Sequence, residues 1–385
     1  MPQLQAPPLS LYVHLPWCVR KCPYCDFNSH AVGDALPADP YIDGLLADLE
    51  LDLPLVWGRP VQTIFFGGGT PSLFSGAHYE RLLSGIRARL TLSPAAEVTL
   101  EVNPGTVEHD SFAAYRDAGI NRFSLGVQSF SDPALRKIGR IHGRAEALCA
   151  VEALQAAGIT NFNLDLMFAL PGQDLREALD DVRTALSCAP AHISHYQLTI
   201  EPNTAFHANP PELPDDDQAW RMQEACGRLL AEGGFEPYEI SAWARPQCEC
   251  RHNLNYWRYG DFIGIGAGAH GKLTLPAEQS VRRRVRLRHP TAWLRSIRAG
   301  DGVLAEDRVL PPEERVFEFF LNQLRLRRGV RKSQFGPRTG LAWEVVAQRV
   351  EQLLERGLLS EQGDWLMPTE LGWRFSNEAQ ALFLP

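Results

Sequence analysis

The chain lacks a hydrophobic run long enough to cross a membrane, and it lacks an excess of positive charge. A membrane-spanning helix is indicated by about 18 or more consecutive apolar residues, and no uninterrupted run approaches that length. The first ten residues, MPQLQAPPLS, have neither the basic flank nor the apolar core of a secretory signal. The 38 lysines and arginines are outnumbered by 46 aspartates and glutamates, giving a net charge of −8. We therefore expect a cytoplasmic protein with no membrane span, although peripheral membrane contact stays open, and no nucleic-acid partner.

The composition is that of a globular protein without internal repeats. Hydrophobic residues make up 45% of the 385 residues and charged residues 22%, which excludes disordered and low-complexity classes. At about 150 residues per domain, the length corresponds to two or three domains.

Short apolar strands alternate with amphipathic helices through residues 1–245. Such alternation is typical of β-α units joined by right-handed crossovers, with a parallel sheet. We expect an α/β fold, a partial (β/α) barrel whose chemistry lies at the carboxyl ends of the strands. The predicted strands are 11–15, 61–66, 97–102, 122–128, 162–168, 195–200 and 237–243. The predicted helices are 41–53, 81–90, 110–119, 144–158 and 174–186.

The pattern changes after residue 245. Residues 246–305 show little helical periodicity and form a connecting region, in which 263–271 is predicted as a glycine-rich turn and 282–288 as an exposed basic strand. Residues 306–385 predict helices followed by a hairpin, a smaller C-terminal helical domain with a winged-helix-like pattern. This domain has 11 basic and 12 acidic residues, so a packing or partner surface is favoured over DNA binding.

Three cysteines follow the first strand within eight residues: Cys18, Cys22 and Cys25 in PWCVRKCPYCDF. Three closely spaced thiolates can hold three irons of an iron-sulfur cube and leave the fourth iron open to another ligand. Structural zinc and unreactive buried thiols are the alternatives, although structural zinc usually uses paired knuckles. The role of Cys248 and Cys250 stays open.

Polar residues also follow the next strands. The glycines of GGGTP (67–71) let the backbone approach a ligand closely, and Glu101, Gln128 and Asp165 stand at or near the ends of successive strands. Because the carboxyl ends of parallel strands share one edge of a barrel, these residues together predict a pocket.

The order of C-x3-C-x2-C, GGGTP, EVNP, GVQSF and NLDLM resembles the radical S-adenosylmethionine (SAM) superfamily, and within it the oxygen-independent coproporphyrinogen III oxidase family. The resemblance covers about residues 10–385. It implies that Cys18, Cys22 and Cys25 bind a [4Fe-4S] cluster, whose open iron takes the amino and carboxylate groups of SAM, and whose electron cleaves SAM to a radical. The residues implied to line the SAM site are Tyr12, Tyr24, Gly68, Gly69, Thr70, Glu101, Gln128, Arg140 and Asp165.

Two departures from the oxidase pattern point to another branch of this family. The oxidases carry a fourth cysteine where this chain has Phe27, and RHNLNYW (251–257) resembles the H-N-x-x-Y-W motif of HemW-type haem chaperones. That resemblance implies haem as cofactor, with His252 as a haem-binding residue and acceptor haem proteins as partners. An imidazole is a common axial ligand of haem iron, although a histidine among aromatic residues is often only a packing residue.

The sequence thus predicts a haem chaperone on a radical SAM scaffold. The alternative is a radical SAM oxidoreductase acting on coproporphyrinogen III. Whether the chain is an enzyme, and its oligomeric state, are left undecided.

Overall fold

The computed structural model describes residues 2–105 and 111–385, so the start of the predicted helix 110–119 lies outside it. No helix within those two ranges has the length and apolar character needed to cross a membrane. The helices are α1 (Ala38–Glu50), α2 (Leu53–Val56), α3 (Gly76–Arg89), α4 (Phe112–Ala118), α5 (Asp132–Lys137), α6 (Arg144–Ala156), α7 (Leu175–Ser187), α8 (Ala205–Ala208), α9 (Asp216–Glu232), α10 (Arg251–Trp257), α11 (Pro290–Ala299), α12 (Pro312–Gln323), α13 (Lys332–Thr339), α14 (Ala347–Glu355), α15 (Glu370–Arg374) and α16 (Ser376–Ala381).

One twelve-stranded sheet organises most of the chain, in the order β14-β13-β12-β11-β1-β4-β5-β6-β7-β8-β10-β9. The strands from β11 to β8 in this order pair in parallel, and antiparallel strands extend both edges. Its strands are β1 (Leu9–Leu15), β4 (Val61–Gly68), β5 (Leu92–Val102), β6 (Arg122–Gln128), β7 (Phe162–Phe168), β8 (His192–Gln197), β9 (Glu236–Glu239), β10 (Ala242–Ala244), β11 (Asp261–Ile265), β12 (His270–Leu275), β13 (Ser280–Arg286) and β14 (Leu304–Val309).

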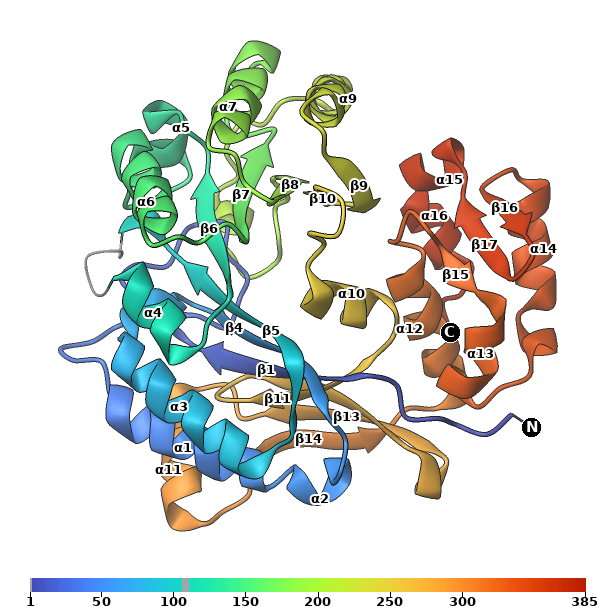
Figure 1. Cartoon of the computed structure of the whole chain (residues 1–385). Helices are drawn as coiled ribbons and strands as arrows, with labels where there is room; N and C mark the ends of the chain where they lie inside the picture. Colours follow the sequence, from blue (N-terminus) through green and yellow to red (C-terminus); the bar gives the residue numbers. More distant parts are fainter. Residues whose placement is uncertain (1, 106–110) are drawn as a thin grey trace.

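The curved sheet is covered by helices on its outer side, as the partial barrel requires (Figure 1). Helices α1, α3, α4, α6 and α7 lie outside the strands, while the short α10 lies on the inner side and contacts β4, β1 and β11. The main hydrophobic core lies between the sheet and these outer helices. The α/β partial barrel predicted from the sequence is therefore confirmed.

Local signals in the sequence explain where several helices begin and end. Asp174 and Glu177 form a reciprocal capping box at the start of α7. Their side chains accept hydrogen bonds from two backbone N–H groups that have no acceptor within the helix. Helix α4 ends at Gly119, whose φ of 112° lies in the left-handed region that glycine adopts without strain.

The region 246–305 differs from its prediction. It contains two helices, α10 and α11, and its strand β11 pairs in parallel with β1 near the middle of the sheet. The prediction of little helical structure there is wrong, because both helices are short and their periodicity spans few residues. The sheet continues past residue 245, while the glycine-rich turn between β11 and β12 lies where the sequence indicated.

The basic strand is not exposed either. Arg286 is buried on β13 and pairs with Asp48 (Nε to Oδ1, 2.8 Å) and Asp52 (Nη2 to Oδ2, 2.7 Å), two buried carboxylates near the end of α1. Arg284 pairs with the same Asp52. Buried charges need ion-pair partners. Here the partners lie far away in the sequence, so the local pattern of arginines suggested a solvated face.

The predicted strand 237–243 is also two strands, β9 and β10, joined by a turn. An isolated bridge between Glu239 of β9 and Leu326 links this edge to the C-terminal part of the chain.

Helices α12 to α16 surround a second hydrophobic core, with a small sheet in the order β15-β17-β16. Its strands are β15 (Val330–Arg331), β16 (Leu359–Gln362) and β17 (Trp365–Pro368). The order helix, strand, helices and hairpin confirms the predicted winged-helix-like pattern. Two further short strands, β2 (Trp17–Cys18) and β3 (His30–Ala31), pair with each other and bracket the cysteine loop.

Candidate functional site

One cavity of about 450 Å³ lies at the carboxyl ends of the parallel strands. We call it the cluster cavity. Of the thirteen residues predicted for the iron-sulfur cluster, SAM and haem, eleven line it. These are Cys18, Cys22, Cys25, Tyr24, Gly68, Gly69, Thr70, Glu101, Gln128, Arg140 and Asp165. The structure therefore brings together residues from the segment after β1, from β4 to β7 and from the loop after α5, while Tyr12 and His252 lie elsewhere.

The three cysteines of the loop are half-buried free thiols. Cys25 Sγ lies 3.8 Å from Ser29 Oγ, and Cys22 Sγ lies 3.7 Å from Nη1 of Arg140. Burial raises the pKa of the Cys18 and Cys25 thiols. Within the described residues, no three His, Cys, Asp or Glu side chains converge closely enough to hold a single metal ion. Thiolates that each bind a separate iron of a cube need no such common centre.

The glycines of GGGTP allow the loop after β4 to pass close to the loop after β1. Gly68 has a φ of 118°, and a Cβ there would lie 2.6 Å from the ring of His14. A Cβ on Gly69 would lie 2.5 Å from the carbonyl oxygen of Trp17. Thr70 N–H donates to that same carbonyl at 2.7 Å. Side chains larger than hydrogen at both positions would therefore separate this loop from the cysteines.

Two carboxylates face the cavity, Glu101 from β5 and Asp165 from β7, with β6 between these strands. Burial, followed by the nearby charge of Asp165, raises the pKa of Glu101 to about 8. Glu101 Oε2 accepts a hydrogen bond from Gly68 N–H at 3.2 Å. Burial also raises the pKa of Asp165, although Ser124 and Asn163 donate to its oxygens at 3.0 and 2.8 Å. Because both carboxyl groups are buried and their pKa values are raised, a cationic ligand nearby would favour their charged forms.

Arg140 reaches the cavity from the loop after α5. Its Nη2 donates to the Gly126 carbonyl at 2.7 Å, while its buried Nε has no hydrogen-bond partner among the described residues. Gln128, at a φ of 70°, accepts at Oε1 from the hydroxyl of Tyr196 at 2.7 Å. Both side chains are therefore held in place by neighbours, with donor groups left for a ligand.

Sequence reasoning missed the contribution of β8. Ser194 and Tyr196 point from this strand into the cluster cavity, and Ser194 donates through Oγ to Asn163 at 3.2 Å. The predicted strand 195–200 began three residues late. The alternation of polar residues in HISHYQ was the signal that could have identified them.

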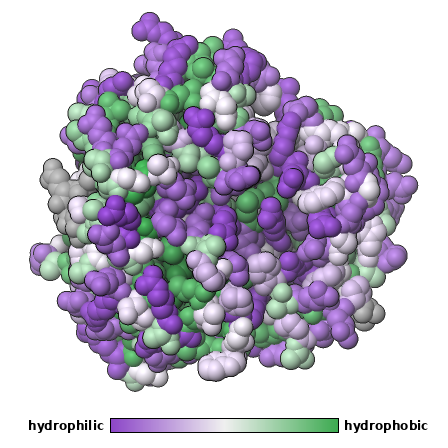
Figure 2. All heavy atoms as spheres, viewed as in Figure 1, coloured by the Kyte–Doolittle hydropathy of each residue, from purple (hydrophilic) through white to green (hydrophobic). Residues whose placement is uncertain are grey.

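A second cavity, of about 720 Å³, adjoins the first and shares Asp26, Phe27, Gly68, Glu101 and Trp257 with it. We call it the aromatic cavity. Tyr12 lies here rather than in the cluster cavity, and its hydroxyl bonds to Nδ1 of His14 at 2.9 Å. Hydrophilic side chains cover most of the face seen in Figure 2, and hydrophobic ones show through near its centre.

His252 lines neither cavity. Its side chain on α10 is buried, with a residue exposure of 1%, and its Nδ1 lies 2.7 Å from Oγ1 of Thr63. Because Thr63 donates its own proton to Ser10, we assign the proton of this bond to Nδ1. Nε2 then carries a lone pair, and within the described part of the chain it has no partner. Burial lowers the pKa of His252 to about 3.

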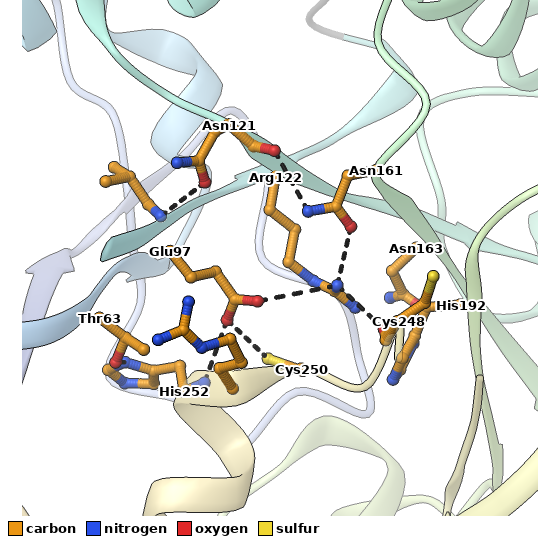
Figure 3. Close-up of polar contacts among 12 residues, drawn as sticks. Thr63, Glu97, Asn121, Arg122, Asn161, Asn163, His192, Cys248, Cys250 and His252 are labelled. Carbon is orange, nitrogen blue, oxygen red and sulfur yellow. Dashed lines mark hydrogen bonds and ion pairs between the residues drawn. The ribbon is translucent and has the colours of Figure 1, made fainter. Parts of the chain in front are cut away.

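Cys248 and Cys250 do not line the cluster cavity. Cys250 is buried, and its thiol donates to Glu97 Oε1 at 3.7 Å, while the same oxygen accepts from His252 N–H at 3.1 Å (Figure 3). The Cys248 carbonyl accepts from Arg122 at 3.2 Å. Glu97 and Arg122 thus fix the start of α10 against β5 and β6, which gives both cysteines a structural place.

Comparison with known proteins places the chain in a family. The "Heme chaperone HemW" of Escherichia coli is 49% identical over 99% of this chain and 99% of its own length. The protein of the same description from Haemophilus influenzae is 47% identical over 100% of this chain and 99% of its own. The chain belongs to the HemW family. The family model "Radical SAM superfamily" matches residues 12–185, and "HemN C-terminal domain" matches 310–375. The first match covers the chain from β1 to α7, which includes strands β4 to β7 of the cluster cavity. The second match covers most of the second hydrophobic core.

Among solved structures, Escherichia coli coproporphyrinogen III oxidase (HemN) aligns with a TM-score of 0.80 and 21% identity. The alignment covers 98% of this chain and 90% of that one. At this identity the likeness shows the fold, which the HemW family therefore shares with that radical SAM enzyme.

Proposed function

We propose that this chain binds haem and delivers it to acceptor haem proteins in the cytoplasm, on a scaffold that holds a [4Fe-4S] cluster and SAM. The observation that supports a scaffold for the cluster and SAM is that eleven of the predicted residues line one cavity. Haem delivery rests on the full-length similarity to HemW haem chaperones.

The residues of the cluster cavity fit the cluster and SAM. Cys18, Cys22 and Cys25 are free thiols on one loop, each able to bind its own iron. The Gly68–Gly69 backbone and the buried Glu101 suit the carboxylate and amino groups of SAM, because N–H groups attract an anion and a carboxylate attracts a cation. When bound, the cluster supplies an electron to SAM. The protein's own part is to bind and orient SAM and to exclude water from the cavity.

Helix α10 carries the motif that links the chain to haem. His252 stays a proposed haem-binding residue, and its unpartnered Nε2 has the lone pair that an iron ligand requires. In this structure the ring packs between Phe65, at 5.0 Å between centroids, and Tyr256, at 4.8 Å. Because Nε2 is buried, direct ligation requires neighbouring side chains to move aside.

The test is made on one anaerobic sample reconstituted with iron and sulfide. Ferric haem is titrated into it, and coproporphyrinogen III, SAM and a strong reductant are then added to a second aliquot. We expect stoichiometric haem binding, passage of the haem to an apo haem protein, and no decarboxylated porphyrinogen. Turnover without haem binding would establish the oxidase alternative and refute the proposal.

A further inference from the structure

The aromatic cavity has a lining suited to a large, flat, partly anionic ligand. Its volume of about 720 Å³ lies within the range of small-molecule sites. Tyr256 and Phe262 stand edge to face, with ring centroids 4.4 Å apart, and Trp257 continues this wall toward the cluster cavity. Phe27 lies at the boundary between the two cavities with 59% of its surface exposed. The exposed ring of Phe27 and the half-buried rings of Tyr256 and Trp257 offer apolar surface to a planar ring system, while Phe262 is buried and packs against Tyr256.

Four cationic side chains line the same cavity, and three of them already have carboxylate partners. Lys272 pairs with Asp261 at 3.0 Å, Arg283 with Glu318 at 2.8 Å, and Arg286 with Asp48 and Asp52.

Arg288 is different. It is exposed, and no carboxylate of residues 2–105 or 111–385 lies within ion-pair distance of it. Its guanidinium is therefore the group in this lining that can bind a carboxylate without first breaking an ion pair.

His270 is the accessible imidazole of the cavity. It begins β12 directly after the glycine-rich turn, and its side chain is exposed. The structure, as far as it describes the chain, gives neither ring nitrogen of His270 a hydrogen-bond partner. The other histidine in the lining, His14, uses both nitrogens, with Tyr12 at 2.9 Å and the Asn28 carbonyl at 2.8 Å. Burial lowers the pKa of His270, which leaves the imidazole neutral at pH 7.

We propose that the aromatic cavity is the haem site of this chain, with His270 as the axial ligand to iron and Arg288 as the partner of a propionate. The porphyrin lies against Tyr256 and Trp257, and Phe27 covers the side that faces the iron-sulfur loop. His252 then acts as a positioning residue behind Tyr256. This inference rests on the proposed function, and its axial ligand His270 and propionate partner Arg288 lie outside the haem motif.

The experiment titrates three probes into the reconstituted full-length protein: ferric haem, iron-free protoporphyrin IX, and the dimethyl ester of ferric haem. His270→Ala removes only the ligand to iron. We expect it to weaken ferric haem binding at least tenfold and to shift the Soret band, while protoporphyrin binding stays unchanged. Arg288→Ala removes only the propionate partner. We expect it to weaken haem and protoporphyrin severalfold and to leave the dimethyl ester unaffected.

Matched controls are His207→Ala and Arg295→Ala, which remove an exposed histidine on α8 and an exposed arginine on α11. Cluster content and SAM binding report whether each variant is folded.

Three results would contradict the inference. If both test variants bind all probes as the controls do, haem binds elsewhere and the chaperone function stands. If His252→Ala, and not His270→Ala, abolishes the axial-ligand spectrum, the ligand is His252. If the unmodified protein binds no haem at all, the proposed function fails together with this site.

Discussion

The two neighbouring cavities differ in how their walls are assembled. The cluster cavity takes most of its residues from the loops after β1 and β4 and from β5 to β8, so most of its lining follows the chain strand by strand. The aromatic cavity combines β1 with α10, β11, β12 and β13, segments about 250 residues away from β1. The residues of the cluster cavity can therefore be recognised from the order of the sequence motifs, whereas those of the aromatic cavity depend on which distant strands become neighbours in the sheet.

The first way to test this separation is to remove one cluster ligand. Cys22→Ser should abolish cluster assembly, because two thiolates leave two irons of the cube without protein ligands. Haem affinity should stay within about twofold, since Cys22 does not line the aromatic cavity. Iron and sulfide content and a haem titration measure the two outcomes.

Cys149→Ser, which changes an exposed thiol on α6, is the matched control. Loss of haem binding in Cys22→Ser alone would show that the two cavities form one site.

A carboxylate in the cluster cavity provides the next test. Because the free pKa of Glu101 is about 8, this carboxyl group is mostly protonated at pH 7, and a cationic ligand must displace the proton. SAM affinity should therefore rise from pH 6.5 to about 8 and then level off. Glu101→Gln should weaken SAM binding by about 10- to 100-fold at pH 8 and remove the pH dependence.

The Asp165→Asn variant sharpens this prediction, because the charge of Asp165 contributes to the raised pKa of Glu101. The inflection should move to lower pH in that variant. Calorimetry in buffers of different protonation enthalpy measures the released proton directly. An unchanged pH profile in Glu101→Gln would assign the proton to another group.

The same contrast explains what the sequence could and could not predict. Gly68, Glu101, Gln128 and Asp165 were predictable because parallel strands bring their carboxyl ends to one edge, whatever the exact strand boundaries. Tyr12 was placed with them only by resemblance, and in the structure its side chain lines the aromatic cavity. Strand β1 pairs with β4 on one side and with β11 on the other, so Tyr12 stands next to the part of the sheet that follows residue 245.

The second region was harder to predict because its contacts are long-range. The arginines of β13 looked like a solvated face, and only the packing of β13 against α1 reveals Asp48 and Asp52 as their partners. His252 was found as a motif residue, but its burial against Thr63 depends on how α10 packs over β4. No local pattern contains that information.

Asn28 links the segment after the cysteine loop to the glycine-rich turn through its amide group. Asn28 follows the cysteine loop, and its Nδ2 donates to the carbonyls of Ala267 and Arg288, each at 2.9 Å. Asn28→Ala should loosen the glycine-rich turn and the backbone of Arg288, and so weaken haem binding by up to about tenfold, as expected for two lost hydrogen bonds. Cluster content should not change.

Asn28→Asp is the informative companion, since a carboxylate would face two carbonyl oxygens and disturb the turn more than alanine does. If both variants bind haem as the unmodified protein does, Asn28 makes no difference to the aromatic cavity.

The smallest expected effect concerns Phe27, where the oxidases of this fold carry a fourth cysteine. Phe27→Cys should leave the cluster and SAM binding unchanged, because the proposed ligands Cys18, Cys22 and Cys25 would already hold three irons and leave the fourth to SAM. It should weaken haem binding about threefold, by removing an aromatic surface from the boundary of the two cavities. Phe27→Ser should behave in the same way, because serine is similar in size to cysteine but carries no thiol. A gain of coproporphyrinogen decarboxylation in the cysteine variant alone would show that one side chain separates the two activities, and that the aromatic cavity accepts the porphyrinogen as well as haem.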